Sequence, residues 1–284
     1  MKFRIASVLA IFGVIVLIVA LIRHTQAVFL KPEDERLYEQ RSDKRMPVLV
    51  ELFTSEGCSS CPPADDLLAR LDKAQPVPGA EVIALSEHVD YWNHLGWRDP
   101  YSSAEFSRRQ AEYADAFRID GNYTPQMVVD GQTEFVGSNQ SKARDAILKA
   151  SQTEKVAVQL TATGDSSNAA KVSLRVRIEN SPRVKSGDTA EVLIAITEDN
   201  LRSTVLRGEN GGRSLKHTAV VRQLNVIGEI DSEAGQSFDG AYIANLESGW
   251  QRENLRAVVF VQERGSRRVL GAAAINLAAE LGHR

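Results

Sequence analysis

The chain has 284 residues, of which 43% are hydrophobic and 25% are charged, a composition typical of a globular protein. This length is enough for one large domain or two ordinary ones. Because 34 basic and 37 acidic residues nearly cancel to a formal net charge of -3, the composition argues against nucleic-acid binding, and we expect no nucleic-acid partner.

The N-terminus carries a basic start, Lys2 and Arg4, followed by an uninterrupted apolar run at residues 5–22. This pattern is typical of an export signal, and the run just reaches the length of a membrane span. Two interpretations of residues 1–27 therefore stay open, a cleaved signal peptide or a membrane anchor, each followed by a charged tether at 28–45. Both predict a periplasmic or secreted protein, in the second case anchored to the inner membrane by residues 5–22. Disulfides persist in that environment.

Residues 46–150 alternate between apolar, strand-like runs and segments with helical spacing. Near-continuous apolar runs at 48–53 and 82–85 predict strands buried on both faces. Asp130-Gly131 between two β-prone runs is a strong hairpin signal. In chain order we expect a strand at 48–53, a helix from just after Cys61 to about Lys73 and a strand at 82–85. An aromatic and histidine-bearing loop follows at 86–100, and a capping box of Ser102 and Glu105 then starts a second helix. A hairpin at 127–136 and a helix at about 141–150 complete this part of the chain.

The two cysteines of the chain, Cys58 and Cys61, follow the first predicted strand. Two prolines and then leucines at helical spacing come next, which predicts that a helix begins directly after the motif. Unpaired N–H groups and the dipole at a helix N-terminus favour a thiolate on Cys58, and Cys61 is close enough to form a disulfide with it. A disulfide across about four residues stabilises a fold by only about 2 kcal/mol in the entropy model, so a redox role is favoured over a structural one.

After about residue 152 the sequence changes character. Residues 171–179 alternate strictly between apolar and charged side chains, which predicts a half-exposed strand. No long helix competes, so we expect an all-β sandwich of about seven strands at 152–284. The other strand candidates lie at 156–162, 191–197, 219–227, 255–262 and 269–277.

The element order at 46–150, with a Cys-x-x-Cys motif heading the first helix, resembles the thioredoxin fold. Pro125 matches the position at which thioredoxin-like proteins hold a cis proline that faces the dithiol. We therefore expect an α/β thioredoxin-like domain at 46–150 followed by the β-sandwich domain at 152–284. The loop at 86–100 is then an insertion, and we expect it to cover the dithiol side of the domain.

Five blocks of sequence carry a further resemblance, and they lie at 51–65, 88–92, 96–100, 123–131 and 207–210. They are similar to an uncharacterised bacterial family of secreted thioredoxin-like proteins, the domain of unknown function 1223. The resemblance implies the fold and an extracytoplasmic location, but no reaction.

Our preferred hypothesis is an extracytoplasmic thiol–disulfide oxidoreductase that needs no cofactor, although its status as an enzyme stays open. Cys58 would attack thiols or disulfides of extracytoplasmic proteins through a mixed disulfide, and Cys61 would resolve it. Pro125 and Thr124 would border the site. Glu51, inside a buried strand, is either a proton shuttle for Cys61 or a salt-bridged strand residue. This hypothesis requires a sulfur pair close to Pro125 and reachable from solvent.

Two alternatives remain. In the first, Cys58, Cys61, His88 and His94 bind or deliver copper or zinc. In the second, the protein is a non-enzymatic partner-binding protein. The glycine-rich stretch at 208–212 has no phosphate-binding pattern, and we interpret it as a solvated hairpin or as a contact with the first domain or a partner.

Overall fold

The computed structural model describes residues 45–165, 168, 170–180, 184–231 and 237–278. The predicted signal or anchor run at 5–22 and the tether lie outside these residues. Within the described part, no helix is long and apolar enough to cross a membrane.

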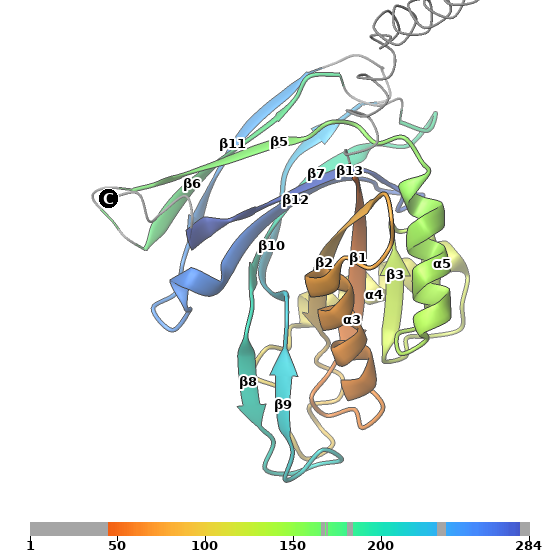
Figure 1. The fold of residues 1–284 in the computed structure, drawn as a ribbon, viewed down its shortest axis with the longest axis vertical. Helices are drawn as coiled ribbons and strands as arrows, with labels where there is room; N and C mark the ends of the chain where they lie inside the picture. The colour runs from red at the N-terminus through yellow and green to blue at the C-terminus, as the bar shows by residue number, and fades with distance from the viewer. Residues whose placement is uncertain (1–44, 166–167, 169, 181–183, 232–236, 279–284) are drawn as a thin grey trace, which may run out of the picture. The chain divides into compact units, whose positions relative to one another are not determined.

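One mixed sheet of eight strands dominates the fold, and it joins strands from both halves of the chain in the order β13-β12-β7-β10-β2-β1-β3-β4 (Figure 1). Its N-terminal strands are β1 (Met46–Thr54), β2 (Ala80–His88), β3 (Gln126–Val129) and β4 (Thr133–Val136), and its C-terminal strands are β7 (Ala190–Glu198), β10 (Val220–Ile230), β12 (Leu255–Glu263) and β13 (Val269–Asn276). The junction lies between β2 and β10, where Val220 pairs with Ser86 and the Ser86 N–H donates to the Ala219 carbonyl at 2.8 Å.

The predicted fold class, a thioredoxin-like α/β domain followed by a β-sandwich, is therefore wrong. The strands expected in the second domain continue the sheet of the first. Strands β7 and β12 are almost entirely buried along their length, so they need cover on both faces, unlike the half-exposed strands of a two-sheet sandwich. The individual elements expected at 46–150 nevertheless form close to their predicted positions.

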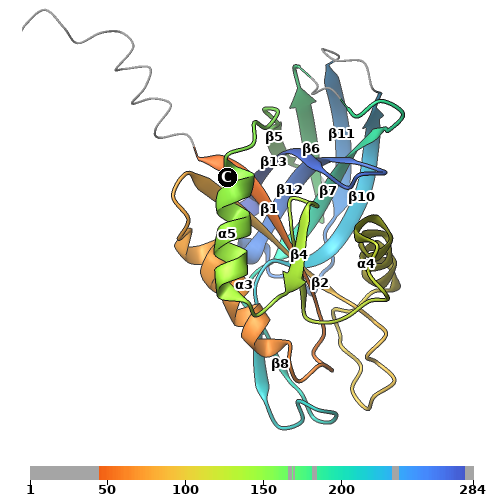
Figure 2. The ribbon, with the colours of Figure 1, turned by 90° about the vertical axis from the view of Figure 1, so that its right-hand side faces the viewer.

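Three described helices cover the sheet, α3 (Pro62–Ala74) and α5 (Gln140–Ser151) on one face and α4 (Ala104–Phe117) on the other (Figure 2). The alternation of β1 explains this arrangement. Val48, Val50 and Leu52 pack with the apolar sides of α3 and α5, whereas Leu49 lies in the core that contains Phe106 of α4. Successive residues of a strand point to opposite faces, so β1 contributes to both cores.

A second, three-stranded sheet packs over the C-terminal half of the large sheet. It consists of β5 (Gln159–Gly164), β6 (Lys171–Ile178) and β11 (Phe238–Asn245), with β6 in the centre. The predicted alternation of β6 is confirmed, because every second residue is buried. Its buried side chains share a core with inward-facing residues of β7 and β12.

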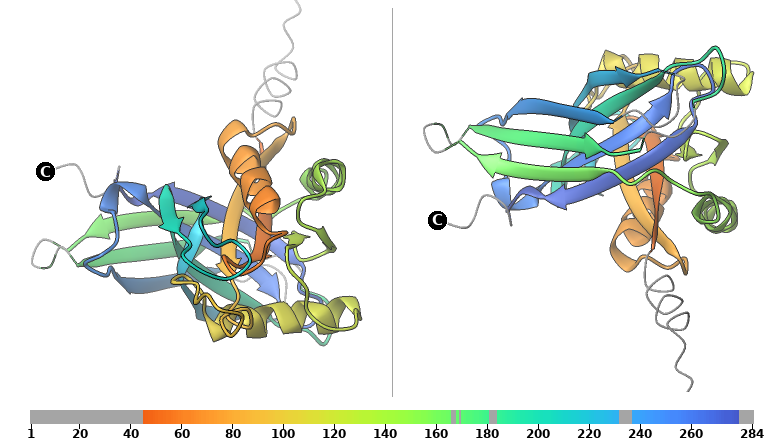
Figure 3. Two further views of the ribbon diagram at one scale, coloured as in Figure 1. Left: turned by 90° about the horizontal axis from the view of Figure 1, so that it is seen from below. Right: turned by 90° about the horizontal axis from the view of Figure 1, so that it is seen from above.

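A short hairpin of β8 (Leu201–Thr204) and β9 (Ser214–His217) extends from the sheets and lies beside the start of α3, as Figure 3 shows from below. The loop that follows β2 reaches the same end of the molecule. Three segments far apart in sequence therefore meet at the N-terminus of α3.

Candidate functional site

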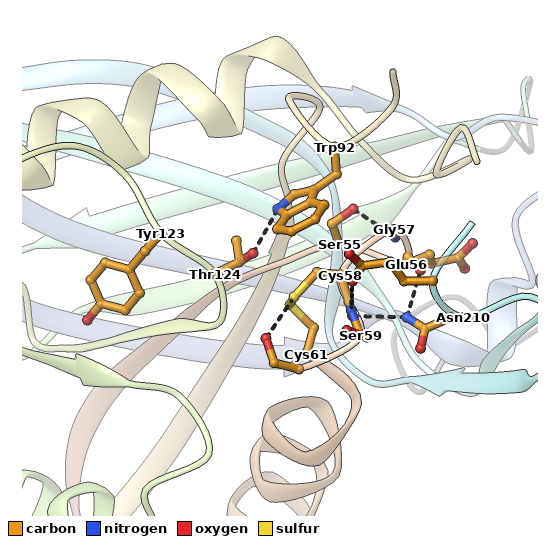
Figure 4. Close-up of a disulfide and its surroundings, with 12 residues drawn as sticks. Ser55, Glu56, Gly57, Cys58, Ser59, Cys61, Trp92, Tyr123, Thr124 and Asn210 are labelled. Carbon is orange, nitrogen blue, oxygen red and sulfur yellow. Dashed lines mark hydrogen bonds between the residues drawn. A yellow bond between two sulfur atoms is a disulfide. The ribbon is translucent and has the colours of Figure 1, made fainter. Parts of the chain in front are cut away.

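The cysteine motif forms the turn between β1 and α3. The Cys58 N–H donates to the Ser55 carbonyl at 3.1 Å, and the Cys61 N–H donates to the Cys58 carbonyl at 3.2 Å. Pro62 then begins α3, where a missing N–H costs nothing. Cys58 and Cys61 form a disulfide with a Cα–Cα distance of 5.4 Å (Figure 4). The predicted placement of the motif at the start of a helix is confirmed.

Both cysteines are fully buried, with 0% of their surface exposed. The two serines between them are exposed, however, and the Ser60 hydroxyl lies 3.3 Å from Cys58 Sγ. The sulfur pair therefore lies one side chain beneath the surface. Solvent access, which the redox hypothesis requires, is not met in this structure.

The other required neighbour, Pro125, is close to the motif. The Thr124–Pro125 peptide bond is cis, as the position of the proline suggested. A Cβ atom added to Gly137 would lie 3.1 Å from Ala64 Cβ and 3.2 Å from Pro125 Cβ, which places Pro125 against the first turn of α3. The proximity of the sulfur pair to Pro125 is thus met.

The loop after β2 covers the disulfide, as predicted. The Trp92 indole N–H donates to the Thr124 hydroxyl at 2.8 Å, and Figure 4 shows both side chains beside the sulfurs. Trp92 also packs on the motif itself, because a Cβ on Gly57 would approach Trp92 Cβ to 3.1 Å. Trp92 and Thr124 therefore form a bridge next to the disulfide.

The loop of the β8–β9 hairpin holds the motif from another side. The buried Asn210 amide donates to the carbonyls of Glu56 and Cys58, both at 2.9 Å. The Ser59 N–H donates to Glu209 Oε2 at 3.0 Å. Gly208 has a φ of +75° and contacts Trp97, so a side chain there would be strained. Of the two interpretations of this glycine-rich stretch, contact with the N-terminal part of the chain is the one observed.

Two buried histidine–carboxylate pairs lie behind the motif. His217 Nε2 is 3.0 Å from Glu56 Oε1, and His88 Nδ1 is 2.7 Å from Asp99 Oδ2. The two imidazole rings meet edge to face with centroids 4.9 Å apart. Burial acts to raise the pKa of Asp99, but His88 and the N–H groups of Glu56 and Tyr101 hold this pKa below its ordinary value. Asp99 is therefore an anion that anchors His88 and the motif together.

Asp65 completes this buried cluster from α3. Its backbone N–H donates to the Cys61 carbonyl at 3.1 Å, and its Oδ1 is enclosed without a hydrogen-bond partner. Burial raises the pKa of Asp65 to about 7, against the opposing influence of His217 and of the Thr54 hydroxyl. A carboxyl group whose pKa is raised by burial thus belongs to the residue one helical turn beyond Cys61. Two further enclosed atoms have no described hydrogen-bond partner, namely His88 Nε2 and His217 Nδ1.

Glu51 lies elsewhere, on the face of the sheet that α4 covers. Arg109 Nε donates to Glu51 Oε1 at 2.7 Å, and Tyr113 donates its hydroxyl proton to Glu51 Oε2. Of the two interpretations of Glu51, the salt-bridged strand residue is the one observed. Glu87 is buried beside the same ion pair, and burial together with the charge of Glu51 raises its pKa well above the ordinary value.

The four residues of the metal alternative are not brought together. Cys58 and Cys61 are joined in the disulfide, His88 faces Asp99, and His94 is exposed on the loop. Within the described ranges, no group of three or more His, Cys, Asp or Glu residues is arranged to hold a metal ion.

One comparison with known proteins shows the family. The family described as "Protein of unknown function (DUF1223)" matches residues 49–262, and the chain belongs to this family. The thioredoxin-like character implied by the resemblance is not confirmed. A search of the curated proteins finds no match.

Two solved structures share the fold at low sequence identity. Protein AGR_C_4864 from Agrobacterium tumefaciens is 23% identical with a TM-score of 0.59, and the match covers 85% of this chain and 97% of that one. HBP35 of Porphyromonas gingivalis is 13% identical with a TM-score of 0.58, covering 84% of this chain and 78% of that one. Both are likenesses of fold alone.

Proposed function

We propose that this protein is an extracytoplasmic thiol–disulfide oxidoreductase whose redox centre is Cys58–Cys61. The observation that carries the proposal is the placement of this disulfide at the start of α3 close to the cis Pro125, with Asp65 and its enclosed Oδ1 following one helical turn later. Breaking a disulfide leaves a thiolate that must be protonated, and an acid with a pKa near neutrality is suited to this transfer. The bond also spans too short a loop to contribute much stability.

In the oxidising direction, a substrate thiolate attacks Cys58 Sγ and forms a mixed disulfide. The bond between the two cysteine sulfurs breaks, its electron pair leaves on Cys61 Sγ, and Asp65 donates a proton to that sulfur. A second substrate thiolate then attacks the substrate sulfur of the mixed disulfide and displaces Cys58 as a thiolate. The substrate dithiol is oxidised to a disulfide, and the cysteine pair is reduced. The reductase direction reverses these steps.

The proposal requires the cover over the sulfurs to open. Ser60 is the smallest obstacle, because its exposed side chain is within hydrogen-bond distance of Cys58 Sγ. Trp92 is only half-buried, and the single side-chain hydrogen bond of its indole is to Thr124. Displacing these side chains would uncover Cys58 without unfolding α3.

A location outside the cytoplasm is part of the same proposal. The basic start and apolar run at 5–22 support export, and disulfides persist mainly in oxidising compartments.

A second candidate function is favoured by the complete burial of both cysteines. In this alternative the protein is a non-enzymatic partner-binding protein, and the disulfide keeps the loop before α3 in the shape that Asn210 recognises. Buried disulfides of this kind resist reduction by the glutathione pool.

The reduction potential and the single-cysteine variants distinguish the two candidates. An oxidoreductase should equilibrate with glutathione at a potential above about −300 mV, whereas a structural bond should lie below it. Cys58→Ser should abolish exchange with a protein disulfide, and Cys61→Ser should accumulate mixed disulfides. A bond that stays oxidised in excess glutathione, with no mixed disulfide in Cys61→Ser, would overturn the redox proposal.

A further inference from the structure

The outward face of the β8–β9 hairpin carries two cations directly opposite each other. Arg202 and Lys216 are paired across the strands, and both side chains are exposed. Like charges in this arrangement destabilise a hairpin. Neither side chain has an ion-pair partner among the described residues. The free protein therefore maintains an unfavourable charge pair at this position.

The same sign continues to the tip of the hairpin. Arg207 and Arg213 are exposed on the connecting loop, and Glu209 is the one acidic residue between positions 201 and 217. Glu209 already accepts the Ser59 N–H, so it does not neutralise the arginines by a described ion pair. A chain with a formal net charge of -3 thus concentrates positive charge on one small hairpin.

This positive surface begins next to the disulfide. Glu209 contacts the residue that follows Cys58, and Asn210 contacts Cys58 itself. Leu206, on the same loop, is 72% exposed and so is available for an apolar contact beside the charges. We call Arg202, Leu206, Arg207, Arg213 and Lys216 together the basic rim.

We propose that the basic rim docks an acidic segment of the partner protein, with an apolar residue seated on Leu206, beside the cysteine that the partner presents to Cys58. Opposite charges accelerate encounter and fix the register of a bound segment. Such a segment would also relieve the repulsion between Arg202 and Lys216. The inference names the substrate class of the proposed exchange reaction and rests on it for the exchange step alone, because docking itself needs no sulfur chemistry.

Direct binding tests the docking step separately from redox chemistry. The probe is a labelled, cysteine-free peptide, Glu-Glu-Leu-Ser-Glu-Glu, and its control is Lys-Lys-Leu-Ser-Lys-Lys, each added to the oxidised full chain. We expect the acidic peptide to bind at least tenfold more tightly at low salt, and the preference to fall as salt screens the charges. Equal binding of the two peptides would overturn the inference.

Charge-removing variants locate the site. Arg202→Gln combined with Arg207→Gln should lower the affinity for the acidic peptide at least fivefold. Lys171→Gln, which removes an exposed cation on β6, should leave it unchanged. A loss as large in Lys171→Gln would mean a general charge effect and contradict the proposal. Tight binding to vesicles rich in phosphatidylglycerol, without binding of the acidic peptide, would also contradict the proposal. The basic rim would then recognise a membrane surface.

Exchange kinetics with cysteine-containing forms of the same peptides separate the two proposals. Faster exchange with the acidic form supports both. Exchange at equal rates with both forms would refute the docking inference and leave the oxidoreductase proposal standing. The acidic peptide could also bind selectively but undergo no thiol–disulfide exchange with the protein, even after the protein has been treated with dithiothreitol. That result would refute the oxidoreductase proposal and retain the docking surface.

Discussion

The backbone N–H of Asp65 donates to the carbonyl oxygen of Cys61, so the acid follows the second cysteine by one turn of α3. The side chain of Asp65 is turned into the protein, where its Oδ1 is enclosed without a partner. Asp65 is therefore half-buried, with at least one carboxyl oxygen withdrawn from solvent. Asp66, the next residue, is exposed and provides a matched comparison.

Asp65 should make the stability of the oxidised protein depend on pH. Because folding raises the pKa of Asp65 from 3.8 to about 7, the native state holds this proton more tightly than the unfolded chain does. The contribution of Asp65 is therefore present at low pH and is lost as the pH rises toward and through about 7. Asp65→Asn should remove this loss, so the variant should gain stability over the parent protein at pH 8 relative to pH 5.

Urea unfolding between pH 5 and pH 8 measures this effect, with Asp66→Asn as the control. Parallel pH profiles for Asp65→Asn and the parent protein would show that Asp65 is solvated like Asp66.

The bridge between Trp92 and Thr124 should slow reduction of the disulfide. Trp92→Phe keeps an aromatic ring but removes the N–H donor, and a neutral hydrogen bond contributes about 1 kcal/mol, so reduction by dithiothreitol should accelerate about fivefold. Thr124→Val removes the acceptor and should have a similar effect. The double variant should react no faster than either single variant, because both remove the same interaction.

Trp250→Phe is the control for this kinetic measurement. The Trp250 indole nitrogen is buried without a described hydrogen-bond partner, in the core that β6 shares with β7 and β12. An unchanged reduction rate in Trp92→Phe would mean that the tryptophan does not limit access to the sulfurs.

Asn210 should stabilise the whole molecule through the cysteine motif. Asn210→Ala leaves the carbonyls of Glu56 and Cys58 without their donors, and each unsatisfied buried group costs about 1–3 kcal/mol. We expect the free energy of unfolding to fall by about 2–4 kcal/mol, as measured by urea denaturation. Asn245→Ala, an exposed position on β11, should change it by less than about 0.5 kcal/mol. A similar loss of unfolding free energy in both variants would show that the Asn210 hydrogen bonds do not stabilise the cysteine motif.

The two buried glutamates under α4 should respond differently to the same substitution. Glu51 is the nearer ion-pair partner of Arg109, so Glu51→Gln weakens the compensation of a buried cation and should cost about 3–5 kcal/mol. Glu87 lies farther from Arg109, at 3.5 Å, and burial together with the charge of Glu51 raises its pKa well above the ordinary value, so Glu87→Gln should cost less than Glu51→Gln. Urea unfolding at pH 7 compares them. A larger loss for Glu87→Gln would reverse the assignment of charge.

Local features of the site follow from short stretches of sequence. The two prolines after Cys61 suit the first turn of a helix, where their missing N–H groups need no partner, and the apolar run before Cys58 forms a buried strand. The loop after β2 was expected to cover the dithiol because it was too long and too aromatic for a simple connection. Each of these inferences involves residues close together in the chain.

The directions of the Glu51 and Asp65 side chains cannot be predicted from the neighbouring sequence alone. Both are acidic residues within 8 positions of a cysteine in sequence. Only the face of β1 decides that Glu51 points toward α4, and only the packing of α3 decides that Asp65 turns inward. Had the alternation of β1 been carried through to its end, Glu51 and Thr54 would have been placed on opposite faces.

Asn210 and His217 gave weaker signals. The block at 207–210 resembles the family, but nothing in its composition indicates that Asn210 binds the backbone of Cys58, 152 positions earlier. His217 stands just before the predicted strand at 219–227, and a single histidine at such a position does not indicate a contact with the cysteine motif. Contacts of this length depend on which strands become neighbours.

The sequence by itself therefore determined the position of the disulfide at the start of a helix, the strands and helices of residues 46–150 and the alternation of β6, because these depend on turn chemistry and periodicity within a few residues. Only the tertiary structure decided that β10 joins β2, that one sheet runs through both halves, and that Glu51 pairs with Arg109 of α4 whereas Asp65 Oδ1 is enclosed on α3. A buried apolar run indicates that both faces of the strand are covered, but it does not indicate which strand lies beside it. Packing across the whole chain decides which strand that is.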